Sequence, residues 1–199
     1  KVLHDNGINY IRIRIWNDPF NADRETYGGG GNDVSTGVEI AKEAAQYDMK
    51  VLLDFHYSDF WAEPAVQLVP KAWKKDVNNT EKMCSDVYDF TKESIQKFKD
   101  AGANIGMVQV GNEITNGLLG IYSNRDKGES FNVIWGDKKK STEVNKYLKA
   151  GIKAVREYTP QALVALHLET PNVWKYKTIM NTWKRDNVDY DVLGSSYYP

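Results

Sequence analysis

Short apolar runs alternate along the chain with longer segments in which apolar residues return every three or four positions. The short runs are rich in Val, Ile, Leu and Tyr and are bounded by turn residues, which is typical of β-strands. We expect five of them, at Ile8–Trp16, Val51–Tyr57, Ile105–Gly111, Leu163–Leu168 and Val192–Tyr198. No hairpin pattern joins two neighbouring runs. The alternation therefore predicts an α/β fold in which helices connect the strands of a parallel sheet.

The longer segments predict helices. Lys1–Gly7 has the pattern of a last helical turn that Gly7 ends. The spacing of Thr36 and Glu39 predicts a capping box, and the apolar face that follows consists of Ile40, Ala41, Ala44 and Ala45. Two further apolar faces consist of Met83, Val87, Phe90, Ile95 and Phe98, and of Val144, Tyr147, Leu148, Gly151, Ile152 and Val155. Gly102 and Pro160 end these two helices, and a shorter helix is expected over Val173–Lys184.

A glycine tract, Gly28–Gly31, lies between the first strand and the first long helix, where a phosphate-binding loop could sit. The dinucleotide-binding spacing fails because Asp33 stands where the third glycine is needed. The Walker pattern also fails because no Gly-Lys-Ser/Thr follows. We therefore expect a flexible surface loop here.

Composition and charge narrow the class of protein. The 199 residues include 26 basic and 27 acidic side chains, and a formal net charge of −1 argues against nucleic acid as a partner. The single cysteine, Cys84, excludes an intrachain disulfide. No apolar stretch approaches the length of a membrane span, and the first residues contain no apolar core of a signal peptide. Because no linker divides the chain, we expect residues 1–199 to form a single domain.

In a barrel of parallel strands, catalytic groups gather at the carboxyl ends of the strands. The first strand alternates isoleucines with Arg12 and Arg14. If the isoleucines face the helices, both arginines point inward, where each needs a carboxylate or a substrate group. An edge strand with both arginines in water is the alternative.

The next strand ends are also rich in polar and aromatic side chains. Asp54 and His56 share one face of the second strand, although His56 could equally be a buried, hydrogen-bonded core histidine. The third strand ends in Gly111-Asn112-Glu113, where a solvated loop glutamate is the alternative. The fourth strand ends at His167 and the fifth in Ser195–Pro199. Polar or aromatic groups at five consecutive strand ends favour an active site at this end of the sheet.

Metal and serine-nucleophile chemistry have little support. The chain contains three histidines and one cysteine, without His-x-x-x-His or Cys-x-x-Cys spacing. A Gly-x-Ser-x-Gly nucleophile elbow is also absent from the sequence. Carboxylate chemistry remains the best candidate, and we expect no metal site.

Four segments carry a resemblance to a known family: Ile11–Trp16, Asp54–Trp61, Val108–Glu113 and Ser196–Pro199. In this order they resemble the arabinogalactan endo-β-1,4-galactanases of glycoside hydrolase family 53, in particular its bacterial members. The stretch Phe-His-Tyr-Ser-Asp-Phe-Trp is the most diagnostic. The resemblance implies a (β/α)8 TIM barrel, of which this chain would hold about strands two to six. Residues 1–199 would then be a partial catalytic domain truncated at both ends.

The resemblance also implies roles for individual residues. Glu113 would be the general acid/base, Asn112 would hold the 2-hydroxyl of the sugar, and Arg14 would support the nucleophile. The cleft would be lined by His56, Asp59, Trp61, His167 and Tyr197. Further sugar contacts would come from Glu63, Pro64 and Asn172, although the family more usually has Asp where this chain has Glu63.

The implied activity is endo-acting, retaining hydrolysis of internal β-1,4 bonds in galactan, a side chain of pectin. Retaining enzymes use two carboxyl groups about 5–5.5 Å apart, and the nucleophile would be a Glu beyond the C-terminus of this chain. No cofactor is expected in this segment, although the resemblance implies a calcium site in bacterial members outside these residues. We expect a secreted monomer that binds β-1,4-galactan and neither nucleic acid nor membrane.

Two alternatives stay open. One is another retaining barrel glycosidase, such as a β-mannanase or an endoglucanase. The other is an inactive carbohydrate-binding fragment. The chain by itself is expected to be inactive and to fold poorly, because its outer strands would be unpaired and Arg12 and Arg14 would lack the carboxylates of the missing strands.

Overall fold

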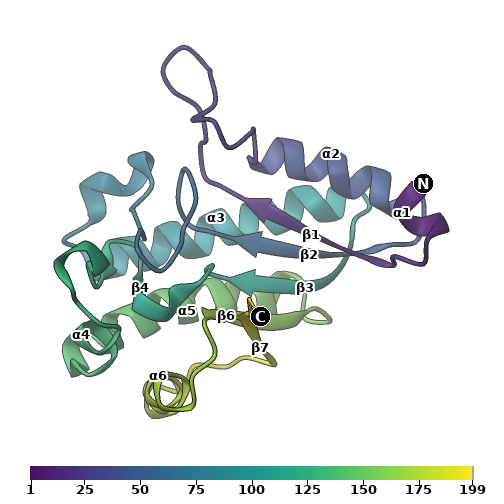
Figure 1. The fold of residues 1–199 in the computed structure, drawn as a ribbon. Helices are drawn as coiled ribbons and strands as arrows, with labels where there is room; N and C mark the ends of the chain where they lie inside the picture. The colour runs from purple at the N-terminus through teal and green to yellow at the C-terminus, as the bar shows by residue number, and fades with distance from the viewer. Residues whose placement is uncertain (199) are drawn as a thin grey trace.

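The computed structural model of the chain describes residues 1–198. Its main sheet has five parallel strands in the order β1-β2-β3-β6-β7 (Figure 1). The strands are β1 Tyr10–Ile15, β2 Lys50–Phe55, β3 Asn104–Val110, β6 Leu163–Glu169 and β7 Val192–Ser196. All five expected strands are confirmed, and every observed end lies within two residues of the prediction. Pro199, the last residue of the Ser-Tyr-Tyr-Pro motif, lies outside the described residues.

A short helix, α1 Val2–Asp5, precedes β1, and the other helices lie in the connections between the strands and cover the outer face of the curved sheet (Figure 1). They are α2 Val34–Ala45, α3 Thr80–Asp100, α4 Asn132–Trp135, α5 Lys138–Tyr158 and α6 Val173–Arg185. The predicted helices are confirmed, including the short turn before Gly7 and the end of α5 before Pro160. A 3₁₀ helix over Lys71–Asp76 and two shorter 3₁₀ turns lie in the connecting loops.

The start of α2 differs from the prediction. Asp33, in extended backbone conformation, caps the helix by accepting a hydrogen bond from the Thr36 N–H at 3.1 Å. The prediction that Thr36 begins the helix is therefore wrong, because the aspartate three residues earlier reaches the free N–H groups of the first turn.

The buried face of α2 is narrower than expected. Ile40 is 43% exposed, and the helix instead buries a stripe of small residues made of Gly37, Ala41 and Ala44. A Cβ atom on Gly37 would lie 2.9 Å from Phe98 and 3.0 Å from Ile15. The helix therefore packs closely on the sheet, and this close approach leaves Ile40 at the rim.

A small hairpin that was not predicted from the sequence follows β3. Strands β4 (Gly117–Leu118) and β5 (Ile121–Tyr122) pair in antiparallel fashion. The two turn residues, Leu119 and Gly120, both have left-handed backbone conformation with φ near 50° and 82°. Two-residue strands are too short to show alternation, and leucine is an unusual residue for such a turn. The sequence therefore did not reveal this hairpin, although, as expected, no hairpin joins neighbouring strands of the main sheet.

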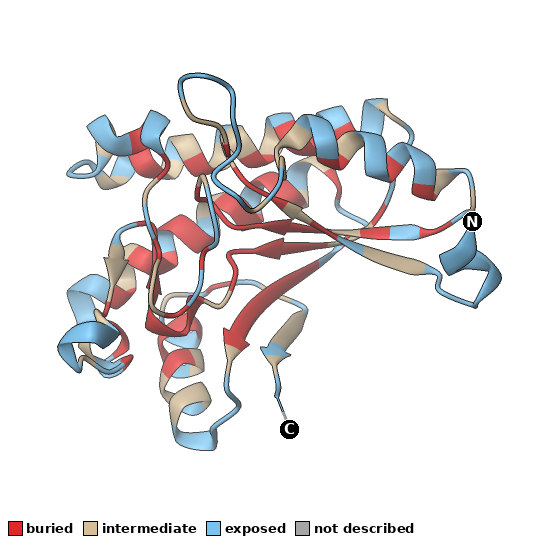
Figure 2. Ribbon diagram, turned by 45° about the horizontal axis from the view of Figure 1, so that its top comes forward, coloured by how far each residue is buried: buried red, intermediate tan, exposed pale blue. Residues whose placement is uncertain are grey.

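The two faces of the sheet differ in polarity. Ile15, Leu53 and Phe55 are fully buried against the helices, and Figure 2 shows the buried residues concentrated along the strands and on the helix faces that meet them. The strand register aligns Arg14 with Asp54 and Asp54 with Gln109 on the opposite face. The prediction that the arginines face away from the helices is confirmed.

The glycine tract lies at the surface, as expected, but it is not free of contacts. A Cβ atom on Gly29 would lie 2.5 Å from Trp16 and 2.8 Å from Phe60. The loop therefore packs over aromatic side chains at the ends of β1 and β2. Its flexibility stays a prediction. Among residues 1–198, no helix combines the length and the apolar character that crossing a bilayer requires.

Candidate active site

A network of polar side chains lies at the carboxyl ends of β1, β2 and β3. Asp54 is fully buried, and its carboxylate lies 2.9 Å from Arg12 Nη2 and 3.1 Å from His56 Nε2. The Gln109 amide donates a hydrogen bond to the other Asp54 oxygen. Arg12 thus has the carboxylate partner that an inward-pointing arginine needs, and the neighbouring strand β2 supplies it.

His56 uses both ring nitrogens within the protein. Its Nδ1 accepts a hydrogen bond from the Ala62 N–H at 3.1 Å, while Nε2 faces Asp54. The residue is only 1% exposed. This placement matches the alternative of a buried, hydrogen-bonded histidine, and its role in the cleft wall stays a prediction.

The chain leaves β3 through a sharp turn that presents Asn112 and Glu113. Gly111 has a φ of 85°, and a Cβ atom there would lie 2.6 Å from Ile114 Cγ2. Glu113 also adopts left-handed backbone conformation, with φ 47° and ψ 48°. A non-glycine residue in this region costs on the order of 1 kcal/mol. The surrounding hydrogen bonds must hold this turn in place.

Asn112 is held in one orientation at the centre of the network. Its Oδ1 accepts a hydrogen bond from Arg12 Nη2 at 2.8 Å, and its Nδ2 donates to the Ala62 carbonyl oxygen at 2.8 Å. The side chain of Gln67 donates to the Asn112 carbonyl oxygen at 2.9 Å. Neither Gln67 nor Gln109 was predicted from the sequence to be part of the site.

Glu113 belongs to a cluster with Asn112, His167 and Ser196, which we call the Glu113 cluster. Ser196 Oγ lies 2.6 Å from Glu113 Oε1 and 3.0 Å from His167 Nε2. His167 Nδ1 lies 2.8 Å from Asn112 Oδ1. Burial, and secondly the Arg12 cation, lower the pKa of His167 to about 4. Ser196 was missed as a site residue, although it lies in the quoted Ser-Tyr-Tyr-Pro motif at the end of the fifth strand.

Arg14 and Trp61 meet at the ends of β1 and β2. The Arg14 guanidinium carbon lies 4.2 Å from the centre of the Trp61 ring, a cation–π arrangement. Trp61 is 41% exposed, and its ring also contacts Trp16 edge-on at 5.8 Å between centroids. The structure therefore brings these two predicted site residues together.

Asp59, Glu63 and Pro64 lie in the loop after β2. Both Asp59 carboxylate oxygens accept backbone N–H groups, from Asp18 at 3.0 Å and from Lys71 at 2.7 Å, and burial raises the pKa of this carboxyl. Its position ties two loops together. Glu63 is exposed, while the Pro64 carbonyl oxygen accepts a hydrogen bond from Asn116.

Asn172 and Tyr197 are not joined to the Glu113 cluster by hydrogen bonds within residues 1–198. Asn172 caps α6 by accepting the Lys175 N–H at 3.0 Å. Tyr197 is 69% exposed after the end of β7. Their predicted sugar contacts stay predictions.

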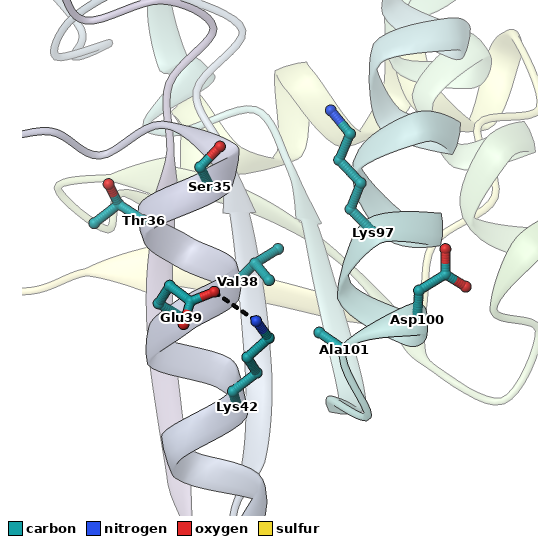
Figure 3. A pocket seen from close by; sticks show the side chains of 8 residues that line it. All are labelled: Ser35, Thr36, Val38, Glu39, Lys42, Lys97, Asp100 and Ala101. Carbon is teal, nitrogen blue, oxygen red and sulfur yellow. Dashed lines mark hydrogen bonds and ion pairs between the residues drawn. The ribbon is translucent and has the colours of Figure 1, made fainter.

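A surface hollow of about 600 Å³ lies elsewhere, between α2 and α3 on the outer side of the molecule (Figure 3). It is lined by Ser35, Thr36, Val38, Glu39, Lys42, Lys97, Asp100 and Ala101. Glu39 and Lys42 form an ion pair across part of it. The helices separate this hollow from the polar face of the sheet, so it is not part of the candidate site.

The described part of the chain, residues 1–198, contains no group of three or more His, Cys, Asp or Glu side chains arranged to hold a metal ion. The absence of a metal site from this segment stays a prediction, and none of the chemistry below is routed through a metal. A calcium site outside these residues stays a prediction.

Comparisons with known proteins place this geometry in context. The sequence model of glycosyl hydrolase family 53 matches residues 1–199. The chain is 44% identical to an endo-β-1,4-galactanase of Bacillus subtilis over 198 residues, which cover 99% of this chain and 42% of the relative. It is 29% identical to an arabinogalactan endo-β-1,4-galactanase of Humicola insolens, over 100% of this chain and 54% of the relative.

Among solved structures, the GH53 catalytic domain of Ignisphaera aggregans is 33% identical and superimposes with a TM-score of 0.86. The match covers 100% of this chain and 51% of that domain. The chain thus spans about half the length of the relatives it matches.

Proposed function

This chain belongs to glycosyl hydrolase family 53, and from that membership we propose that the protein hydrolyses internal β-1,4-galactosidic bonds of galactan and arabinogalactan. The family and the barrel fold expected from the sequence are confirmed, and the five parallel strands form a continuous part of that barrel. The substrate is proposed from the named activity of the Bacillus and Humicola relatives. The observation that carries the chemistry is Glu113, a half-buried carboxyl that hydrogen bonds hold beside Asn112 at the end of β3.

Glu113 is proposed to act as general acid and then as general base. In the first step it protonates the oxygen of the leaving sugar, and in the second it takes a proton from the attacking water. Asn112, adjacent to it and held by Arg12, would hold the 2-hydroxyl of the bound sugar. Trp61 offers a partly exposed ring against which a sugar face can stack.

A retaining reaction needs a second carboxylate that forms a covalent bond to the sugar. The acids at the end of β2 are poor candidates for this role. Asp54 is buried and paired with Arg12, and both oxygens of Asp59 are taken by backbone N–H groups. Glu63 lies in the exposed loop that follows. We therefore propose that the nucleophile is a Glu on another barrel strand, outside these residues.

The remaining expectations also belong to this proposal. The binding partner is β-1,4-galactan. The protein would act outside the cell, since polymeric pectin side chains are extracellular. It would act as a monomer. Arg14, which contacts Trp61, would support the nucleophile.

The test is an assay of the full-length protein and its Glu113→Gln variant on β-1,4-galactan, β-1,4-glucan, β-1,4-mannan and xylan. The wild type should release reducing sugar fastest from galactan. The turnover of the variant on galactan should be about 10²–10⁴-fold lower than that of the wild type, which is the contribution typical of general acid catalysis. An activated aryl galactoside should be spared in its first step, because its leaving group needs little protonation.

Glu43→Gln, an exposed substitution on α2, is the matched control and should keep wild-type turnover. Equal or faster hydrolysis of mannan or glucan would refute the substrate. A Glu113→Gln variant that keeps more than about a tenth of its galactan turnover would show that Glu113 is not the acid.

A further inference from the structure

We propose that Ser196 and His167 form a hydrogen-bond relay that keeps the unliganded Glu113 protonated, so that Ser196 is a positioning residue for the general acid. This inference rests on the proposed function of Glu113. It follows from the direction in which each hydrogen bond of the Glu113 cluster must run.

The direction is set first at Asn112. An arginine only donates hydrogen bonds and a carbonyl oxygen only accepts them. Because Arg12 lies 2.8 Å from Asn112 Oδ1 and the Ala62 carbonyl oxygen lies 2.8 Å from Nδ2, the amide has one possible orientation. Its oxygen therefore faces His167 Nδ1.

The next step assigns the proton of His167. Nδ1 and Asn112 Oδ1 are 2.8 Å apart, and two acceptors at this distance require a hydrogen between them. Nδ1 therefore carries a proton. The Glu113 N–H at 3.3 Å and the Gln109 amide at 3.4 Å also face Nδ1 as donors and would need a lone pair there, but both contacts are longer than the one to Asn112. The shorter contact decides the tautomer.

His167 is neutral at neutral pH, because burial and the Arg12 cation lower its pKa to about 4. Nε2 then has a free lone pair, and the only hydrogen of the Ser196 hydroxyl, 3.0 Å away, is donated to it. The lone pairs of Ser196 Oγ face Glu113 Oε1 at 2.6 Å. These two oxygen atoms can form a hydrogen bond only if the Glu113 carboxyl carries the hydrogen and donates it to Ser196 Oγ. The relay therefore favours the protonated acid.

The relay can return to this state after each turnover. When Glu113 gives its proton to the leaving sugar oxygen, the Ser196 hydrogen turns from His167 to the new carboxylate. When Glu113 takes a proton from the attacking water, the hydroxyl turns back. Serine and histidine end the cycle with the protons they began with, so no further reactant is needed.

Other charged or titratable groups around the cluster stay the same when Ser196 is replaced. They are Arg12 on β1, Asp54 and His56 on β2, Glu169 on β6 with its partner Lys175, and Tyr176 on α6. Tyr176 contacts Ser195, the neighbouring serine, at 2.6 Å. Ser195 is exposed and outside the Glu113 cluster, which makes it a matched control.

The first measurement is the pH profile of kcat/KM on galactan, which reports groups of the free enzyme. In full-length Ser196→Ala the midpoint of the alkaline limb should move to lower pH by about 0.4–1.1 units, the equivalent of one lost neutral hydrogen bond. Ser196→Thr, which keeps the hydroxyl, should restore the wild-type midpoint. Ser195→Ala should leave it unchanged.

A midpoint that stays in place or moves to higher pH in Ser196→Ala would overturn the relay. The second measurement is ¹⁵N NMR of His167, which needs no catalytic activity. It should show the proton on Nδ1, and a proton on Nε2 would overturn the proposal. Failure of the proposed function is seen separately, as retained activity in Glu113→Gln.

Discussion

At the scale of single residues, the site depends on how each buried polar group is paired. Asp54 is a fully buried carboxylate whose partners are Arg12, His56 and Gln109. The Arg12 side chain is 45% exposed, so the pair is half-exposed, but removing Arg12 would still leave the buried Asp54 carboxylate with less compensation for its charge. Arg12 also orients Asn112. Arg12, which is paired with Asp54, thus also fixes the orientation of Asn112, the residue next to the proposed acid Glu113.

His167 should make stability depend on pH. Its pKa is lowered in the folded protein to about 4, whereas an unfolded histidine titrates near 6.5. The folded state therefore binds fewer protons than the unfolded state between these values, and the free energy of unfolding falls as pH decreases from about 6.5 to about 4. The loss attributable to His167 is roughly 3 kcal/mol.

Chemical denaturation of full-length wild type and His167→Gln at pH 7, 5.5 and 4 measures this contribution. The variant should be less stable at pH 7 but lose less stability on acidification. His4→Gln, which changes an exposed histidine, should follow the wild type. Parallel curves for wild type and His167→Gln would contradict the assignment.

At the scale of elements, each strand delivers its polar residues through register and turn geometry. The left-handed turn at Gly111 and Glu113 directs Asn112 toward β1 and Glu113 toward β7. Helix α2 lies close to the sheet because Gly37 leaves no side chain between them. The first turn of α2 is capped by Asp33, two residues after the glycine tract.

Asp33→Ala should therefore lower the free energy of unfolding by about 1 kcal/mol, the usual cost of losing an N-cap. Thr36→Ala should cost less, because Thr36 contributes only a hydroxyl that donates to Asp33. Ser35→Ala, an exposed change in the same turn, is the control. Urea denaturation of the full-length variants measures all three. A Thr36→Ala variant as unstable as Asp33→Ala would restore the capping box that begins at Thr36.

At the scale of the whole molecule, the described sheet has two edges, β1 and β7. In a closed barrel such edges pair with other strands, which removes unpaired backbone N–H and C=O groups. Ile11 and Leu193 on these edge strands are only partly buried. An open, apolar edge favours pairing with other chains.

Residues 1–199 produced alone should therefore aggregate and release no sugar from galactan, whereas the full-length protein should be soluble and active. Size-exclusion chromatography, a thermal melt and the reducing-sugar assay compare the two. A soluble monomer with a sharp melting transition would contradict the argument from open edges. Galactan cleavage by the short chain would contradict the argument that the nucleophile lies elsewhere.

Local patterns in the sequence determined much of the fold and part of the site. Short apolar runs bounded by turn residues located the strands. Alternation with a period of two in the first strand placed Arg12 and Arg14 on the face opposite the helices, because side chains alternate across any strand. The apolar repeat of α5 identified its buried face, because residues three or four positions apart lie on the same side of a helix. Asn112, Glu113 and His167 could be selected because each stands at the end of an apolar run.

Only the tertiary structure decided which of these residues meet. Asp54 pairs with Arg12 across 42 positions, as the numbering and the β1–β2 pairing show, and Ser196 reaches Glu113 across 83. Alternation within a strand determines the face on which a side chain lies but not which residue of the next strand lies beside it. That alignment depends on the strand register, on bulges such as the shift at Val51/Leu52, and on turns such as the one at Gly111. These features form only when the strands pack together, so the hydrogen-bonded partners of Glu113 followed from the fold.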